Sequence, residues 1–120
     1  MKTIQLGIIE SKFADLIWEN EPITSSELVK IASDTFGWKR TTTHTVIGRL
    51  CNKGLFQNEK GILTALISKE DFYSRMSKEL VDANYNGSLP YFIACFTKQE
   101  KLSKQDIDMI RSIIKEAKEE

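Results

Sequence analysis

One stretch, from Trp38 to Phe56, constrains the fold more than any other, because it predicts a helix with two chemically different faces. Val46, Ile47 and Leu50 recur at helical spacing, and Thr43 extends this stripe by one turn. The opposite face carries side chains that can form hydrogen bonds, some of them cationic: Arg40, Thr41, Thr42, His44, Thr45 and Arg49. A helix that buries one side and offers Thr, Arg and His on the other suits the major groove of DNA.

The distribution of charge favours this interpretation. The 120-residue chain has a formal net charge of zero, but five Lys or Arg residues between Trp38 and Lys60 face the single acid Glu59. No Asp or Glu occurs from Thr35 to Ile47. A neutral chain does not bind nucleic acid indiscriminately, so any basic surface has to be local. The alternative is a polar helix face that is merely solvated.

Two helices are predicted before this stretch. The first is expected over Gly7–Asn20 and ends ahead of Pro22, because proline disfavours helix in the residue before it. Thr24 and Glu27 form a capping box that begins the second helix, which is expected to end near Asp34. Three such helices, the last two joined by a short turn that contains glycine, describe a helix-turn-helix.

A β-hairpin is predicted after Gly54, which is placed to end the third helix. Leu55–Gln57 and Ile62–Ile67 are β-prone and flank the turn residues Asn58–Gly61. Helix-turn-helix and hairpin together make a winged helix. Lys60 is the only cation of the hairpin. Because the hairpin carries so little charge, closure of the core beneath the third helix is at least as well supported as a contact with DNA.

Three apolar helices are predicted to follow this domain and to have little left to cover them. Burial against a second copy of the chain is the simplest solution; packing back onto the N-terminal domain is the alternative. The sequence thus predicts a mainly α protein with a small β-hairpin: a winged helix-turn-helix DNA-binding domain over 1–68 and a helical dimerisation domain over 69–120. The residues expected at the dimer interface are Phe72, Met76, Leu80, Leu89, Phe92, Ile93, Phe96, Leu102, Ile107, Ile110, Ile113 and Ile114.

Catalytic and metal chemistry find no support in the sequence. Cys51 and Cys95 have no metal-site spacing and are expected to be reduced packing residues in a cytoplasmic protein. His44 and Cys51 lie two helical turns apart, roughly 10 Å, which is too far for a catalytic pair. No phosphate loop, signal peptide or membrane span is evident. We expect no enzyme activity, no cofactor, no metal and no membrane insertion.

The chain resembles the penicillinase repressor family, which includes the methicillin-resistance repressors and a copper-responsive type. The resemblance covers almost the whole length and rests on three motifs. These are Glu10-x-x-Phe-Ala-x-x-Ile-Trp18, Trp38-x-x-Thr-Thr-x-x-Thr-Val-Ile-x-Arg-Leu-x-x-Lys-Gly54, and Leu102-Ser103 followed by Ile107-x-x-Ile110. The resemblance implies a homodimeric winged-helix repressor that binds an inverted-repeat operator in double-stranded DNA. It also implies base contacts by Thr42 and Thr45.

Three features depart from the family's pattern. The hairpin from Gln57 to Ser68 is shorter than usual and lacks the Arg and Tyr commonly found there. Antibiotic-responsive members are inactivated by a membrane sensor-protease that cuts between Asn and Phe in the penultimate helix. Cys95 and Phe96 stand at the matching positions and form the candidate cleavage site. The cysteine-rich C-terminal motif of the copper-responsive members is absent, because the chain ends Lys-Glu-Ala-Lys-Glu-Glu120.

The sequence therefore predicts a transcriptional repressor with two classes of DNA contact. Base edges are expected to be read by Arg40, Thr41, Thr42, His44 and Thr45. Phosphates are expected to be contacted by Thr24, Ser25, Lys39, Arg49, Lys53 and Lys60. The alternative function is a winged-helix adaptor that binds proteins and has no sequence-specific affinity for DNA.

Overall fold

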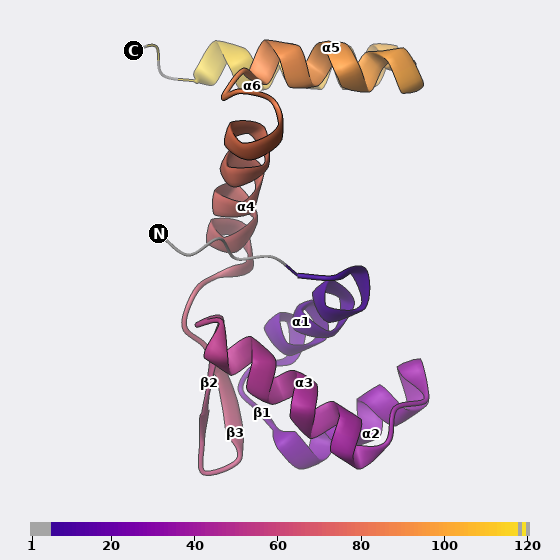
Figure 1. The fold of residues 1–120 in the computed structure, drawn as a ribbon, viewed down its shortest axis with the longest axis vertical. Helices are drawn as coiled ribbons and strands as arrows, with labels where there is room; N and C mark the ends of the chain where they lie inside the picture. The colour runs from indigo at the N-terminus through magenta and orange to yellow at the C-terminus, as the bar shows by residue number, and fades with distance from the viewer. Residues whose placement is uncertain (1–5, 118, 120) are drawn as a thin grey trace. The chain divides into compact units, whose positions relative to one another are not determined.

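The computed structural model describes residues 6–117 and 119 (Figure 1). Its elements, in chain order, are α1 (Ile8–Asn20), β1 (Ile23–Thr24), α2 (Ser25–Phe36), α3 (Arg40–Asn52), β2 (Phe56–Glu59), β3 (Ile62–Ala65), α4 (Lys69–Asn84), α5 (Leu89–Gln99) and α6 (Lys104–Glu116). Packing divides the chain into a first unit that ends at Glu79 and a second unit that begins at Leu80.

The helix-turn-helix forms where local signals predict it. The amide of Glu27 donates to Oγ1 of Thr24 at 3.1 Å, which confirms the N-cap of α2. Helix α2 continues to Phe36, two residues beyond the predicted end, and Gly37 terminates it with a φ of +69°. This left-handed conformation suits glycine, which has no Cβ to clash with the backbone. The turn is short, and α3 begins at Arg40.

The sheet has three antiparallel strands in the order β1-β3-β2, so the predicted hairpin is confirmed and gains a third strand. Phe56 pairs with Ala65, and Glu59 pairs with Ile62. The turn is therefore only Lys60 and Gly61, both with positive φ, rather than four residues. Strand β1, which was not predicted, pairs Ile23 with Leu63. Two residues are too short to show an alternating pattern.

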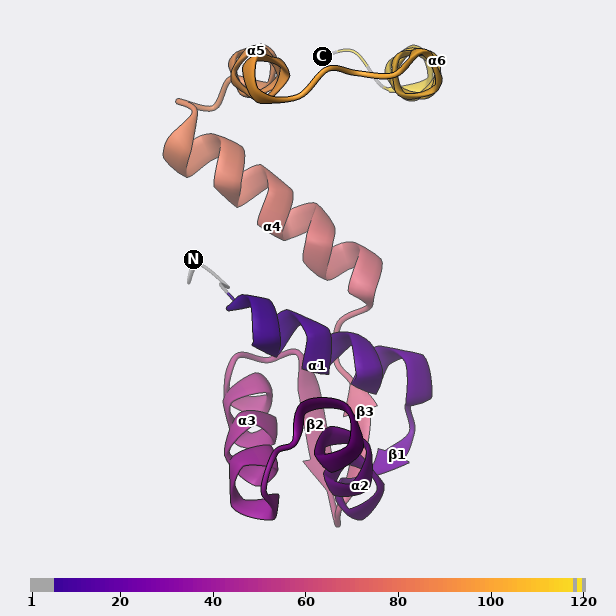
Figure 2. The ribbon, with the colours of Figure 1, turned by 90° about the vertical axis from the view of Figure 1, so that its right-hand side faces the viewer.

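The core of the first unit lies between the helices and one face of this sheet (Figure 2). Helix α1 contributes Phe13 and Ile17, and the hairpin contributes Phe56 and Leu63; all four are fully or almost fully buried. The indole N–H of Trp18 donates to the carbonyl of Ile67 at 3.0 Å, so it keeps a partner inside the packed layer. The hairpin thus closes the core, and the fold is a winged helix.

The start of α4 belongs to the first unit. Phe72 is fully buried in its core, and Met76 packs against that core. Nζ of Lys69 lies 3.2 Å from Oδ1 of Asp15 on α1, and the interaction with this carboxylate raises the pKa of Lys69. The boundary expected at residues 68/69 thus differs from the observed division after Glu79. Phe72 is corrected from a dimer-interface residue to a core residue, because a fully buried ring has no surface left for a second copy.

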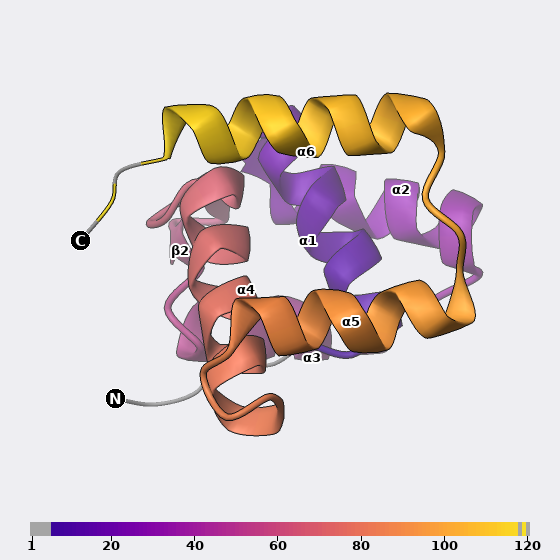
Figure 3. The same ribbon diagram turned by 90° about the horizontal axis from the view of Figure 1, so that it is seen from above.

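The second unit consists of the last turn of α4, α5 and α6 (Figure 3). Hydroxyl N-caps begin both later helices, at Ser88 and at Ser103. The rings of Tyr85 and Phe92 meet edge-on with centroids 5.0 Å apart. No residue of α5 or α6 is buried. No helix in the described part of the chain is both long and apolar enough to span a bilayer.

Candidate nucleic-acid interface

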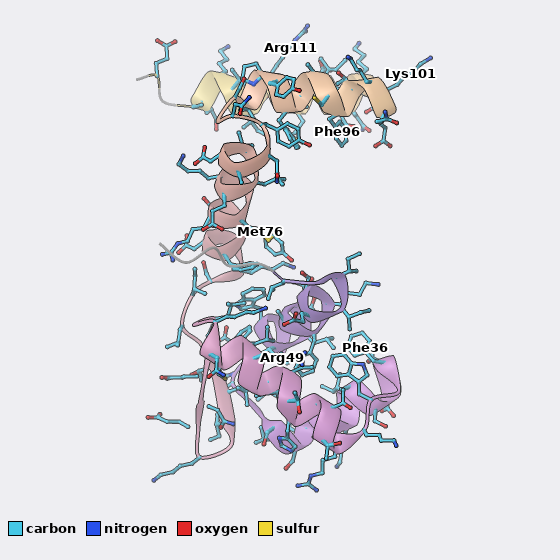
Figure 4. The ribbon with its side chains drawn as sticks, in the orientation of Figure 1. Phe36, Arg49, Met76, Phe96, Lys101 and Arg111 are labelled. Carbon is cyan, nitrogen blue, oxygen red and sulfur yellow. The ribbon has the colours of Figure 1, made fainter. Side chains whose placement is uncertain are left out.

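Helix α3 has the two faces that its sequence predicts. Thr43, Val46, Ile47 and Leu50 are buried. The residues expected to read bases are all exposed: Arg40, Thr41, Thr42, His44 and Thr45. Arg49 is also exposed, on the surface of α3 (Figure 4). No acidic residue lies in this 13-residue helix, so its outer face can approach phosphates without like-charge repulsion.

The hydroxyl groups of α3 are partly committed to the helix itself. Oγ1 of Thr45 donates to the carbonyl of Thr41 at 2.9 Å, and Oγ1 of Thr43 donates to that of Lys39 at 3.2 Å. Such bonds use the hydroxyl proton but leave the lone pairs of the oxygen available to accept a hydrogen bond. Thr45 therefore offers an acceptor and a methyl group, which suit the amino groups of adenine or cytosine and the thymine methyl.

The cations expected at phosphates fall into two environments. Lys39, the N-cap residue of α3, is exposed, as are Arg40 and Arg49. Lys53, at the other end of the helix, has its Nζ 3.2 Å from Oε2 of Glu10 on α1. The charge of Lys53 is thus already compensated within the protein. Sequence reasoning missed this pair, because the partners lie 43 residues apart and only the fold joins them.

The wing, which is the hairpin of β2, β3 and their turn, is joined to the start of α2 by one backbone hydrogen bond, and its turn is held by a bond from an amide to a side chain. The amide of Ser25 donates to the carbonyl of Gly61 at 2.8 Å, and the amide of Gly61 donates to Oδ1 of Asn58 at 2.9 Å. This brings three expected phosphate contacts, Thr24, Ser25 and Lys60, to one edge of the first unit. Glu59 precedes Lys60 and is also exposed, so the tip has an acid beside its cation.

The two cysteines and the candidate cleavage site lie outside the exposed face of α3. Cys51 is partly buried against the core, and burial raises the pKa of its thiol, which disfavours the reactive thiolate. Among residues 6–117 and 119, no group of three or more His, Cys, Asp or Glu side chains could hold a metal ion. Cys95 and Phe96 lie inside α5, where Phe96 is exposed (Figure 4).

The expected dimer-interface residues of the second unit are largely uncovered. Leu80, Leu89, Ile93, Phe96, Ile107, Ile113 and Ile114 are exposed. A shallow groove between α5 and α6, which we call the α5/α6 groove, is lined by Phe92, Ile93, Phe96, Thr97, Leu102 and Ile110. Its only polar lining residue is Thr97, whose hydroxyl donates to the carbonyl of Ile93 at 3.0 Å. The second unit thus exposes an apolar surface that its own helices do not cover.

Comparison of the sequence with a family model and with known relatives gives a consistent result over nearly the full chain. The model of the family described as "Penicillinase repressor" matches residues 6–116. The penicillinase repressor of Bacillus licheniformis is 28% identical, with 98% of this chain and 96% of that protein covered. The methicillin resistance regulatory protein MecI of Staphylococcus aureus is 24% identical, with 94% and 95% covered. The solution structure of monomeric Bacillus licheniformis BlaI in complex with the blaP half-operator matches 58% of this chain and 90% of that chain, with 28% identity and a TM-score of 0.49.

Proposed function

Since the chain belongs to the penicillinase repressor family, we propose that it represses transcription in the cytoplasm as a homodimer that recognises a palindromic operator through α3. Members of this family are transcriptional regulators and not enzymes. The observation that carries the proposal is the outer face of α3, which is exposed, rich in hydroxyl and cationic groups, and free of acids. It sits on a closed core that fixes the helix in place.

In the proposed complex the residues of α3 divide by their chemistry. Thr42 and Thr45 read base edges, assisted by Arg40, Thr41 and His44. Lys39 and Arg49 contact phosphates, and Thr24, Ser25 and Lys60 do so from the wing edge. Because the hydroxyl proton of Thr45 is donated to Thr41, we propose that Thr45 accepts a hydrogen bond from a base amino group or packs on a thymine methyl.

The apolar surface of the second unit supports the homodimer. In the described part of the second unit, nine large hydrophobic residues are exposed, among them Met109, Ile113 and Ile114, each more than 60% exposed. Soluble monomers rarely leave contiguous apolar patches of this kind uncovered. A twofold dimer through α5 and α6 would carry two copies of α3, and such an arrangement matches a palindromic site whose halves lie about one DNA turn apart.

Substitution of Thr45 tests the proposal. A duplex is first selected from a random pool by the wild-type protein, and affinities for it and for a random duplex are then measured at two salt concentrations. We expect Thr45→Ala to lose ~1 to 3 kcal/mol on the selected duplex and almost nothing on the random one. The matched control, Lys39→Ala, should weaken both alike and flatten the log–log salt dependence by about 0.9. Equal losses on the two duplexes for Thr45→Ala would contradict base reading by this residue.

The same measurement separates the repressor from an adaptor. A protein-interaction adaptor would select no duplex, and any residual binding would not fall steeply with salt. Cleavage by a membrane sensor-protease stays a prediction of the family resemblance. Cys95 and Phe96 lie within the hydrogen-bonded turns of α5, so a protease would have to unwind that helix before it could cut between them.

A further inference from the structure

We propose that Glu10 on α1 is a positioning residue for DNA recognition: its carboxylate holds Lys53 at the C-terminal end of α3 and so sets the angle at which this helix meets DNA. The inference rests on the proposed function and assigns Lys53 a role inside the protein rather than at a phosphate. We call this pair the Glu10–Lys53 clamp.

The geometry of the clamp is that of a charge-assisted hydrogen bond. Nζ of Lys53 and Oε2 of Glu10 are 3.2 Å apart, and the two side chains are 33% and 22% exposed. Glu10 lies in the first turn of α1, and Lys53 caps the last turn of α3. A helix favours negative charge at its N-terminus and positive charge at its C-terminus, so both helix dipoles stabilise this pair. Partial burial shields it from the salt that weakens surface pairs.

Helix α1 holds α3 at both ends. Before the first turn of α3, the ring of Trp38 packs on that of Phe13, with centroids 5.1 Å apart. At the other end Lys53 is paired with Glu10, one helical turn before Phe13 on α1. The chain then turns away at once, because Gly54 has a φ of +84° and the amide of Leu55 donates to the carbonyl of Leu50 at 3.2 Å. Lys53 is therefore the last side chain that can fix this end of α3.

Electrostatics separates the clamp from a phosphate contact. A lysine that neutralises a phosphate releases condensed counterions, and its removal lowers the salt slope of binding by about 0.9. A lysine paired with Glu10 releases none, so its removal leaves the slope unchanged. Exposed Lys39, at the opposite end of the same helix, provides the internal standard for a phosphate contact.

The experiment compares Glu10→Gln, Lys53→Met, their double variant and Lys39→Met on the duplex selected by the wild type. Each clamp variant should weaken binding by on the order of threefold to tenfold, in line with the coupling of neighbouring side chains. The double variant should bind no more weakly than Lys53→Met alone, because the Glu10–Lys53 pair is already lost in that single variant. The salt slope should stay at the wild-type value in the clamp variants and fall by about 0.9 in Lys39→Met.

Two results would overturn the inference: a fall of about 0.9 in the slope of Lys53→Met, or losses that add in the double variant. Urea unfolding of every variant shows whether the domain remains folded. Affinities are then compared without urea, at a temperature where all variants are native. Binding by the wild type itself tests the proposed function, whereas differences among the variants test the clamp. Failure of the one is thus distinguishable from failure of the other.

Discussion

The two units of this chain use the same kind of amphipathic helix but bury its apolar side differently. In the described residues, all thirteen buried apolar side chains lie in the first unit, from Phe13 to Phe72. In the second unit, α5 and α6 bury no residue completely. Their helix ends are nevertheless equally well formed: Thr24 caps α2 at 3.1 Å and Ser103 caps α6 at 3.0 Å. Local helix signals therefore do not explain the difference.

The difference comes from what each unit has to close its core. The first unit has a sheet, and Phe56 and Leu63 fill the space between its helices. In its described residues, the second unit has two full helices and one turn of a third, and α5 and α6 leave their apolar stripes unburied. A core that closes within one chain is stable at any protein concentration, whereas one completed by a second copy depends on concentration. The comparison can be tested one side chain at a time.

The largest expected effect is in the first unit. Phe72→Ala removes a fully buried ring and should lower the free energy of unfolding by ~3 to 5 kcal/mol, because the vacated space is only partly refilled. Urea unfolding monitored by tryptophan fluorescence measures this change. Leu66→Ala is the control, because Leu66 is 57% exposed and its truncation should change the free energy of unfolding little. A loss below about 1 kcal/mol for Phe72→Ala would place α4 outside the first unit's core.

A smaller effect is expected in the second unit. Ile113→Asp puts a charge on the apolar side of α6 and should raise the dissociation constant of the proposed dimer by at least about 30-fold, the range of interface hot spots. Sedimentation equilibrium measures the constant, and unfolding of the first unit should not change. The exposed Ile8 on α1 gives the control Ile8→Asp. Should Ile113→Asp leave association intact, the dimer would have to form through another surface.

The smallest effect compares the two hydroxyl caps. Thr24→Ala and Ser103→Ala each remove one capping hydrogen bond and should cost about 1 kcal/mol. The free energy of unfolding lost in Thr24→Ala should be the same at every protein concentration. If the proposed dimer forms, the free-energy cost of Ser103→Ala should appear only in its concentration-dependent transition, because α5 and α6 bury no residue within one chain. Thermal unfolding over a wide concentration range distinguishes the two, and identical behaviour would refute the contrast between the units.

The sequence by itself determined the features that short-range rules govern. The two faces of α3 follow from 3.6-residue periodicity, and its exposed and buried residues were predicted correctly. The cap at Thr24 follows from a hydroxyl placed three residues before a glutamate. The hairpin follows from two β-prone runs around a turn that contains glycine.

Only the tertiary structure decided the features that join distant residues. Strand β1 forms because Ile23 pairs with Leu63 of β3. Phe72 belongs to the first unit because its ring is fully buried in that unit's core. Lys53 pairs with Glu10, which lies 43 residues away in the sequence. The residues next to these positions do not reveal the distant partner, because the sequence does not distinguish one acidic residue from another, or one apolar residue from another of similar size. Which of them meet depends on how the whole chain packs its core.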